Sequence, residues 1–251
     1  MAFWTRLAVA LSFLTCVVSV RTDAKTLQES VAAFGWAGLC IGCLCLCPSI
    51  PVCAFISPYA PLLAGWVWLC VAIGVSGGMH WDGLADVADG LGSRKQGEEF
   101  WRVVHDSSLG TFGVLALGLV GIGQWLCVSI HCEHKDWLVL LVAPMWGRLA
   151  PIWLAQGHCV YSGSKTAHFL AEALQKNPWI GRRFWMLFWA LPLGLCFVLD
   201  MPGLLCLYPA QYGLLVWLRR VAASYGGISG DFLGASVELS VLCFLGTSLV
   251  Q

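Results

Sequence analysis

The stretch WLVLLVAPMWGRLAPIWLAQG, residues 137–157, decides the class of this fold, because it is long and apolar enough to cross a bilayer as one helix. A transmembrane helix needs about 20 consecutive apolar residues, and only Arg148 places a charge in this run. Six further apolar segments occupy approximately residues 31–47, 61–79, 111–130, 184–198, 204–217 and 232–250. We predict an all-α, polytopic transmembrane helical bundle with about seven spans, folded as a single membrane domain over residues 1–251.

The composition supports this class and excludes others. Hydrophobic residues make up 59% of the chain and charged residues 11%, whereas soluble domains carry about 25% charge. The formal net charge is zero, and no interleaving of basic and aromatic residues indicates nucleic-acid binding. Cysteines such as Cys40, Cys43, Cys45 and Cys47 lie inside an apolar run without a second cluster to complete a metal site. We interpret them as small apolar packing residues.

The N-terminal segment combines features of a signal peptide and of a membrane helix. Arg6 precedes the apolar run LAVALSFLTCVVSV, as in a signal peptide, but Arg21, Asp23 and Lys25 follow directly and the cleavage pattern is poor. The run is shorter than a span. We expect it to be retained as an interfacial or half-inserted helix.

The basic residues predict the orientation, because cytoplasmic loops retain Lys and Arg. An inside N-terminus leaves Lys135 alone outside and places the acid-rich stretch described next on the cytoplasmic side. The basic residues assigned to that side are Arg6, Arg21, Lys25, Arg94, Lys95, Arg102, Lys165, Lys176, Arg182, Arg183, Arg219 and Arg220.

The stretch MHWDGLADVADGLGS, residues 79–93, concentrates acid in a chain that otherwise has little charge. On a helix, Asp82, Asp86 and Asp89 share one face within roughly 60° of arc. Like charges at this spacing repel, and no Lys or Arg lies in the stretch to neutralise them. Oxygen ligands favour a hard cation, which predicts Mg²⁺ held together with substrate phosphates. His80 is placed to orient a ligand, and Gly83 leaves room for close packing or for a phosphate.

Two later stretches repeat acids beside glycine at the start of a span. In HDSSLGTFG, residues 105–113, Asp106 precedes Gly110 and Thr111, which suit an anion at a helix N-terminus; alternatively, Ser108 or Thr111 is only an N-cap. In GGISGDFLGASVEL, residues 226–239, the turn ends in Gly230 and Asp231. The span that follows contains Glu238, and an acid inside a membrane span indicates a functional residue. Arg148 is a further candidate contact for an anion.

These stretches resemble the cobalamin synthase family, the adenosylcobinamide-GDP ribazoletransferases. The resemblance rests on HWDGLADVADGLG, HDSSLGTFGVLAL and GGISGDFLGASVEL, with weaker similarity in ALSFLT at residues 10–15, in residues 34–42 and in GRLA at residues 147–150. It covers nearly the whole chain in order. One departure is Ser108, which stands where family members often carry a basic residue.

The resemblance implies a multi-pass protein of the bacterial cytoplasmic (inner) membrane with its active site on the cytoplasmic side. It implies Mg²⁺-dependent transfer of adenosylcobinamide phosphate from adenosylcobinamide-GDP to α-ribazole or its 5′-phosphate, with release of GMP. In this reaction we expect Asp82, Asp86 and Asp89 to hold Mg²⁺ against the diphosphate. Asp106 or Asp231 completes the site or accepts the hydroxyl proton. Association with other corrinoid-pathway enzymes and the oligomeric state are left open.

Other functions are compatible with part of the pattern. CDP-alcohol phosphotransferases and prenyltransferases also hold a diphosphate through Mg²⁺ on membrane helices, but the acid spacing here lacks the pattern typical of either class. A cation transporter tends to place ionisable groups near the bilayer midplane, often between inverted repeats. No repeat is visible in this chain.

Overall fold

The structure is a computed structural model that describes residues 2–55, 57–157 and 159–250. Within these ranges the regular elements are helices, apart from an isolated parallel bridge between Val160 and Ile228. The all-α prediction is therefore confirmed. In chain order the helices are α1 Phe3–Leu14, α2 Ala24–Ser30, η1 Val31–Ala33, α3 Phe34–Ala54, α4 Ala60–Ser76, α5 Met79–Gly92, α6 Glu98–Val104, α7 Thr111–His134, α8 Trp137–Ala155, α9 Lys165–Lys176, α10 Pro178–Leu199, η2 Pro202–Cys206, α11 Leu207–Ser224 and α12 Gly230–Thr247.

Five helical segments in the described ranges are long and apolar enough to cross a membrane: Ala24–Ala54, Thr111–His134, Trp137–Ala155, Pro178–Leu199 and Gly230–Thr247. Helices α4 and α5 pass the same test together, but the chain bends by 89° between them, so they form a sixth span that is broken, or a re-entrant loop. Helix α11 is not among these spans, although the sequence predicted one at residues 204–217, and it carries the polar residues Gln211, Arg219 and Arg220. The multi-pass class is confirmed, with five to six spans by length and hydropathy where the sequence predicts about seven.

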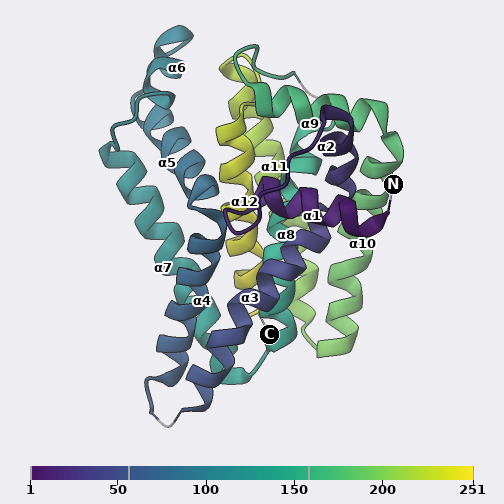
Figure 1. Ribbon diagram of the computed structural model, residues 1–251. Coiled ribbons are helices and arrows are strands. Elements are labelled where there is room, and N and C mark those ends of the chain that lie inside the picture. The colour runs from purple at the N-terminus through teal and green to yellow at the C-terminus, as the bar shows by residue number, and fades with distance from the viewer. Residues whose placement is uncertain (1, 56, 158, 251) are drawn as a thin grey trace.

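Helix α8 forms the centre of the bundle, with α3 and α12 packed along it (Figure 1). Its Trp146 and Trp153 are fully buried. The approach of α3 depends on two glycines: a Cβ atom on Gly38 would lie 2.4 Å from the Met145 Cα, and one on Gly42 would lie 2.2 Å from the Leu141 carbonyl oxygen. Small residues at such contacts let helix backbones approach closely, as membrane helices do in the absence of a hydrophobic driving force between them.

The two ends of the bundle differ in charge. Helices α2, α6 and α9 gather at one end, and the α3–α4 and α7–α8 connections lie at the other (Figure 1). Apart from Arg6 of α1, the basic residues assigned above to one side belong to α2, α6 and α9, to the connections beside them, to the start of α10 or to the end of α11, whereas Lys135 lies in the α7–α8 connection. Helix α1 lies across the bundle (Figure 1), as an interfacial helix would, and Arg6 joins it to Glu29 of α2 by a 3.0 Å ion pair.

The contact between α3 and α8 predicts a stability effect. Replacing Gly42 with Ala places a methyl group against the α8 backbone, so we expect a loss of about 1–3 kcal/mol of stability, as for other overpacked sites. The midpoint of thermal unfolding of the purified protein in detergent measures it. The matched control is Gly194→Ala in α10, where an added Cβ meets no atom within 4 Å. Equal midpoints for the two variants would show that α3 does not pack on α8 in this way.

Candidate active site

Helix α5 carries the three predicted acids on one face. It begins after Gly77 and Gly78, whose φ angles of 62° and 74° are left-handed and end α4, so that the chain can turn sharply. Asp82, Asp86 and Asp89 are all helical, which confirms their predicted spacing on one helix face. Asp82 is exposed, and the other two are partly buried.

Helix α12 brings a fourth acid to this face. A Cβ atom on Gly83 would lie 2.9 Å from the carbonyl oxygen of Asp231 and 3.0 Å from its Cα. Of the two roles that the sequence left open for Gly83, the structure therefore supports close helix packing. The hydroxyl of Ser229, the N-cap of α12, donates to Asp231 Oδ2 at 3.0 Å and orients the carboxylate. No sequence pattern had paired Gly83 with Asp231.

The four acids form one electrostatic group. Asp82 and Asp89 lie about one turn to either side of Asp86 on α5, and the Asp231 backbone packs against Gly83 of the same helix, so three carboxylates act on the charge of Asp86. No ion pair joins any of the four to a basic side chain in the described parts of the chain. Like charges this close disfavour ionisation of all members at once. We call Asp82, Asp86, Asp89 and Asp231 the acid face. Protonation of one carboxylate or binding of a cation would relieve the repulsion among them.

Asp89 already has partners within the protein. Its Oδ2 accepts from the Gly110 N–H and its Oδ1 from the Gly113 N–H, each at 2.8 Å. The N-terminus of α7 thus receives an anion, as predicted for the Gly110 and Thr111 turn, but the anion is a side chain of the protein. The N-cap is Gly110, so neither Ser108 nor Thr111 caps the helix. The role of Asp89 as a metal ligand stays a prediction.

Asp106 lies apart from the acid face. It is exposed in the connection between α6 and α7, and its hydrogen-bond partner is Ser108 of the same connection. The Ser108 N–H at 2.9 Å and the Ser108 hydroxyl at 2.7 Å both donate to Asp106, and these hydrogen bonds hold its pKa below the usual value. The structure therefore brings together four of the five acids proposed from the sequence, and Asp106 shapes a turn.

The acid face fits a magnesium ion only if a substrate contributes ligands. Among the described residues, no group of three or more His, Cys, Asp or Glu side chains is placed to hold a metal ion. Mg²⁺ does not need such a cage, because it is usually held by one or two carboxylates, water and substrate phosphates. The exposed Asp82 and the partly buried Asp86, one helical turn apart, meet that requirement.

A second polar group is buried between α5, α7, α8 and α12. Gln124 Nε2 donates to Glu238 Oε2 at 3.1 Å, and His80 Nδ1 lies 3.8 Å from Glu238 Oε1. Arg148 of α8 is buried in the same region, where its charge interacts with that of Glu238, and its Nε has no hydrogen-bond partner among the described residues. Arg148 and His80, predicted as substrate contacts, are only 2% and 5% exposed. Their burial favours a structural role, and Gln124, a polar residue in an apolar span, was missed from the sequence.

An aromatic cluster holds the GGISGD turn in place. Trp101 of α6 stacks on Tyr161 with ring centroids 3.7 Å apart and donates from Nε1 to the Tyr225 carbonyl oxygen at 2.8 Å. The Tyr161 N–H donates to the Ile228 carbonyl oxygen at 3.0 Å, and the Gly230 N–H donates to Ser164 Oγ at 3.0 Å. Sequence reasoning missed this cluster. The only available signal was the aromatic residues in otherwise polar connections.

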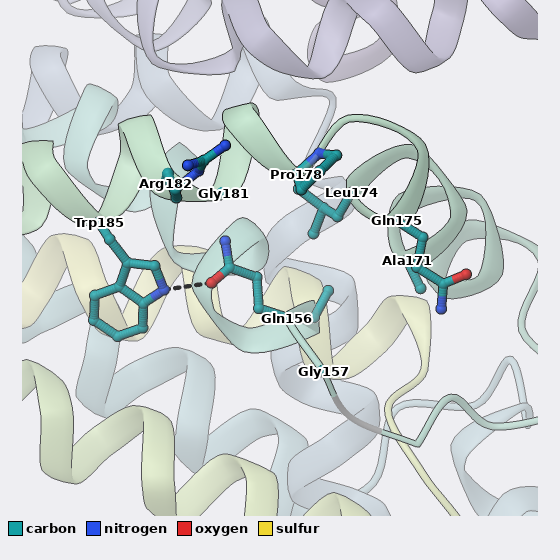
Figure 2. A pocket seen from close by; sticks show the side chains of 10 residues that line it. Gln156, Gly157, Ala171, Leu174, Gln175, Pro178, Gly181, Arg182 and Trp185 are labelled. Carbon is teal, nitrogen blue, oxygen red and sulfur yellow. Dashed lines mark hydrogen bonds between the residues drawn. The ribbon is translucent and has the colours of Figure 1, made fainter.

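A cavity of about 490 Å³ opens between the C-terminal end of α8 and the helices α9 and α10. Figure 2 shows Gln156 and Trp185 pointing toward one another, with the indole N–H of Trp185 donating to Gln156 Oε1. None of the lining residues belongs to α5, α7 or α12, and none is an acid. This cavity therefore lacks the carboxylates that a metal and diphosphate site requires.

Comparisons with known proteins identify relatives over almost the whole chain. A family model described as Cobalamin-5-phosphate synthase matches residues 6–249. Two proteins named adenosylcobinamide-GDP ribazoletransferase come from Nitratidesulfovibrio vulgaris: that of strain Miyazaki F is 31% identical, over 99% of this chain and 96% of its own, and that of strain Hildenborough is 30% identical, over 91% of each. A protein of the same name from Acinetobacter baumannii is 29% identical, over 99% of this chain and 97% of its own. No solved structure matches.

The site geometry predicts that two acids of the same helix differ in their effect on stability. Asp89→Ala removes the acceptor for two N–H groups at the start of α7, so we expect a loss of about 1–2 kcal/mol, as for other lost helix caps. Asp82→Ala removes an exposed side chain, so its effect stays within about 0.5 kcal/mol. Thermal unfolding and amide hydrogen exchange at residues 110–113 measure the difference. An equal loss in both variants would contradict the capping role.

Proposed function

This chain belongs to the cobalamin-5-phosphate synthase family, and from that premise we propose how its acid face serves the reaction. The chain is a transferase of the final stage of cobalamin biosynthesis, where adenosylcobinamide is joined to ribazole. This membership favours a corrinoid substrate over the CDP-alcohol, prenyl diphosphate and transported cation considered from the sequence. We propose adenosylcobinamide-GDP as donor, α-ribazole or its 5′-phosphate as acceptor, and GMP as the leaving group.

The chemistry is a substitution at one phosphorus atom. A ribose hydroxyl oxygen forms a bond to the phosphorus that esterifies the cobinamide side chain. The bond from that phosphorus to the bridging oxygen breaks, and its electron pair leaves with GMP. The hydroxyl proton passes to a carboxylate of the protein. Catalysis of this kind depends mostly on positioning and on neutralising the charge of the phosphoryl oxygens.

We assign the acids of the acid face different roles in this substitution. Asp82 and Asp86 would hold Mg²⁺ against the diphosphate, and the ion would supply positive charge to the phosphoryl oxygens. Asp231 faces them from α12, oriented by Ser229, and accepts the hydroxyl proton. Asp89 keeps α5 and α7 together. The observation that carries this assignment is the contact of Gly83 with the Asp231 backbone, which brings Asp231 close to Asp86.

We also propose that the acid face opens at the cytoplasmic side of the bacterial inner membrane. Helix α5 leads into α6, at the end of the bundle that also holds α9 (Figure 1), and Asp231 lies in the first turn of α12. The elements at this end carry nearly all of the basic residues, and cytoplasmic segments of membrane proteins retain such residues. The soluble substrates would then reach the site from the cytoplasm.

The assignment predicts a graded loss of turnover. Asp231→Asn keeps the size of the side chain but removes the proton acceptor, so we expect kcat to fall at least about 100-fold. Asp86→Asn weakens the hold on the metal, so we expect a higher Mg²⁺ concentration to be needed for half-maximal GMP release. The assay is GMP release by purified protein with adenosylcobinamide-GDP and α-ribazole.

The matched control is Glu133→Gln, which changes an exposed acid at the opposite end of α7 in the same way. It should release GMP at the normal rate. If Asp231→Asn and Asp86→Asn both turn over at the rate of this control at every Mg²⁺ concentration, the acid face does not perform the reaction.

A further inference from the structure

A small apolar cavity lies beside the acid face and has no part in the mechanism above. Its volume is about 140 Å³, and it is enclosed by α1, α3, α8 and α9 together with the first turns of α5 and α12. Aromatic rings line it: Phe13 stacks on Phe34 with centroids 5.8 Å apart and contacts Phe169 at 5.7 Å. The lining side chains with oxygen or nitrogen atoms are those of His80 and Thr166.

The size of the cavity limits what it can hold. Drug-sized ligands occupy pockets of about 300–1,000 Å³, whereas an apolar cavity of about 150 Å³ binds a benzene ring. The cavity of about 140 Å³ is therefore too small for a corrin ring or a whole nucleotide. It is large enough for the carbocyclic part of one aromatic base whose other edge lies at the opening.

The position of the cavity links it to the reacting groups. Gly230 and Gly234 of α12 form part of its wall, and Asp231 follows Gly230 directly in the chain. A Cβ atom on Gly234 would lie 3.3 Å from the His80 Cα, so α5 and α12 stay close along this wall as they do at Gly83. A base held in the cavity would place its attached ribose close to the carboxylate proposed to accept the hydroxyl proton.

We propose that this cavity receives the benzimidazole ring of the ribazole acceptor and selects which base the enzyme joins. The proposal rests on the proposed function and deepens it by naming the acceptor subsite. Benzimidazole has an apolar carbocycle and, once joined to ribose, no N–H group to leave unpaired among phenylalanine rings. A guanine carries several donors and acceptors, and burying these without partners costs free energy. The cavity therefore discriminates between the acceptor base and the guanine of the donor.

Gly230→Ala narrows the cavity without disturbing the helix. The added Cβ would meet Thr166 Cβ at 3.5 Å and Oγ1 at 3.6 Å, which is ordinary contact. Because one methyl group in a hydrophobic pocket changes discrimination about 10-fold or more, we expect the KM for α-ribazole to rise about 10-fold. The KM for adenosylcobinamide-GDP should not change. The base of α-ribazole is a dimethylbenzimidazole, so the rise should be smaller for the riboside of unsubstituted benzimidazole.

Two further variants complete the test. Gly213→Ala in α11 is the matched control, because an added Cβ there meets no atom within 4 Å; both KM values should stay normal. Phe169→Leu removes an aromatic wall from a partly exposed position of α9. It should raise the KM for α-ribazole while kcat is kept, and it replaces Gly230→Ala if that variant does not fold.

Direct binding separates this proposal from the proposed function. The fluorescence of the benzimidazole base reports binding of α-ribazole to the wild-type protein without donor or Mg²⁺. We expect Gly230→Ala and Phe169→Leu to weaken this binding and Gly213→Ala to leave it unchanged. If wild-type protein binds the base but releases no GMP, the proposed function fails and the subsite stands. If wild-type protein releases GMP but neither Gly230→Ala nor Phe169→Leu changes the binding or the KM of α-ribazole, the cavity holds something else, such as a lipid acyl chain, and the proposal is overturned.

Discussion

The packing of Gly83 in α5 against the backbone of Asp231 in α12 is the constraint on which the rest of the site depends. A side chain at position 83 would collide with that backbone, so the two helices could not lie this close with any other residue there. The contact holds Asp231 near Asp86 even though the two carboxylates repel each other. The favourable packing of the helices thus outweighs the repulsion between these carboxylates, which would move apart in a flexible chain.

The surrounding structure supports this arrangement from several sides. The N-terminus of α7 binds Asp89 through two backbone N–H groups, which compensates one of the four charges and fixes the end of α5. Within the apolar interior, Gln124 of α7 donates a hydrogen bond to Glu238 of α12, and His80 Nδ1 of α5 lies 3.8 Å from the same carboxylate without a hydrogen bond. Polar groups at that depth are costly unless they are paired, so the Gln124–Glu238 hydrogen bond opposes sliding of α12 along α7.

The fold class and the acids on α5 could be predicted from the sequence, but the contacts between helices that are distant in the chain could not. Helical periodicity placed Asp82, Asp86 and Asp89 on one face because it depends only on local geometry, and the apolar runs predicted the class of fold. The partners of Asp89 and Gly83 lie 21 or more residues away, on α7 and α12, and no local pattern encodes such contacts. For the same reason the surroundings of Arg148 were missed: its charge was visible, but Glu238, the acid whose charge acts on it, lies on another helix.

The most direct test of the central claim is the binding of Mn²⁺, in place of Mg²⁺, followed by electron paramagnetic resonance on the purified protein. The account predicts that adenosylcobinamide-GDP tightens the binding of one Mn²⁺ ion in the wild-type protein, because the acid face alone supplies too few ligands. It also predicts that this tightening is lost when Asp82 and Asp86 are both replaced by Asn. Donor-dependent Mn²⁺ binding of equal strength in the double variant would contradict the account.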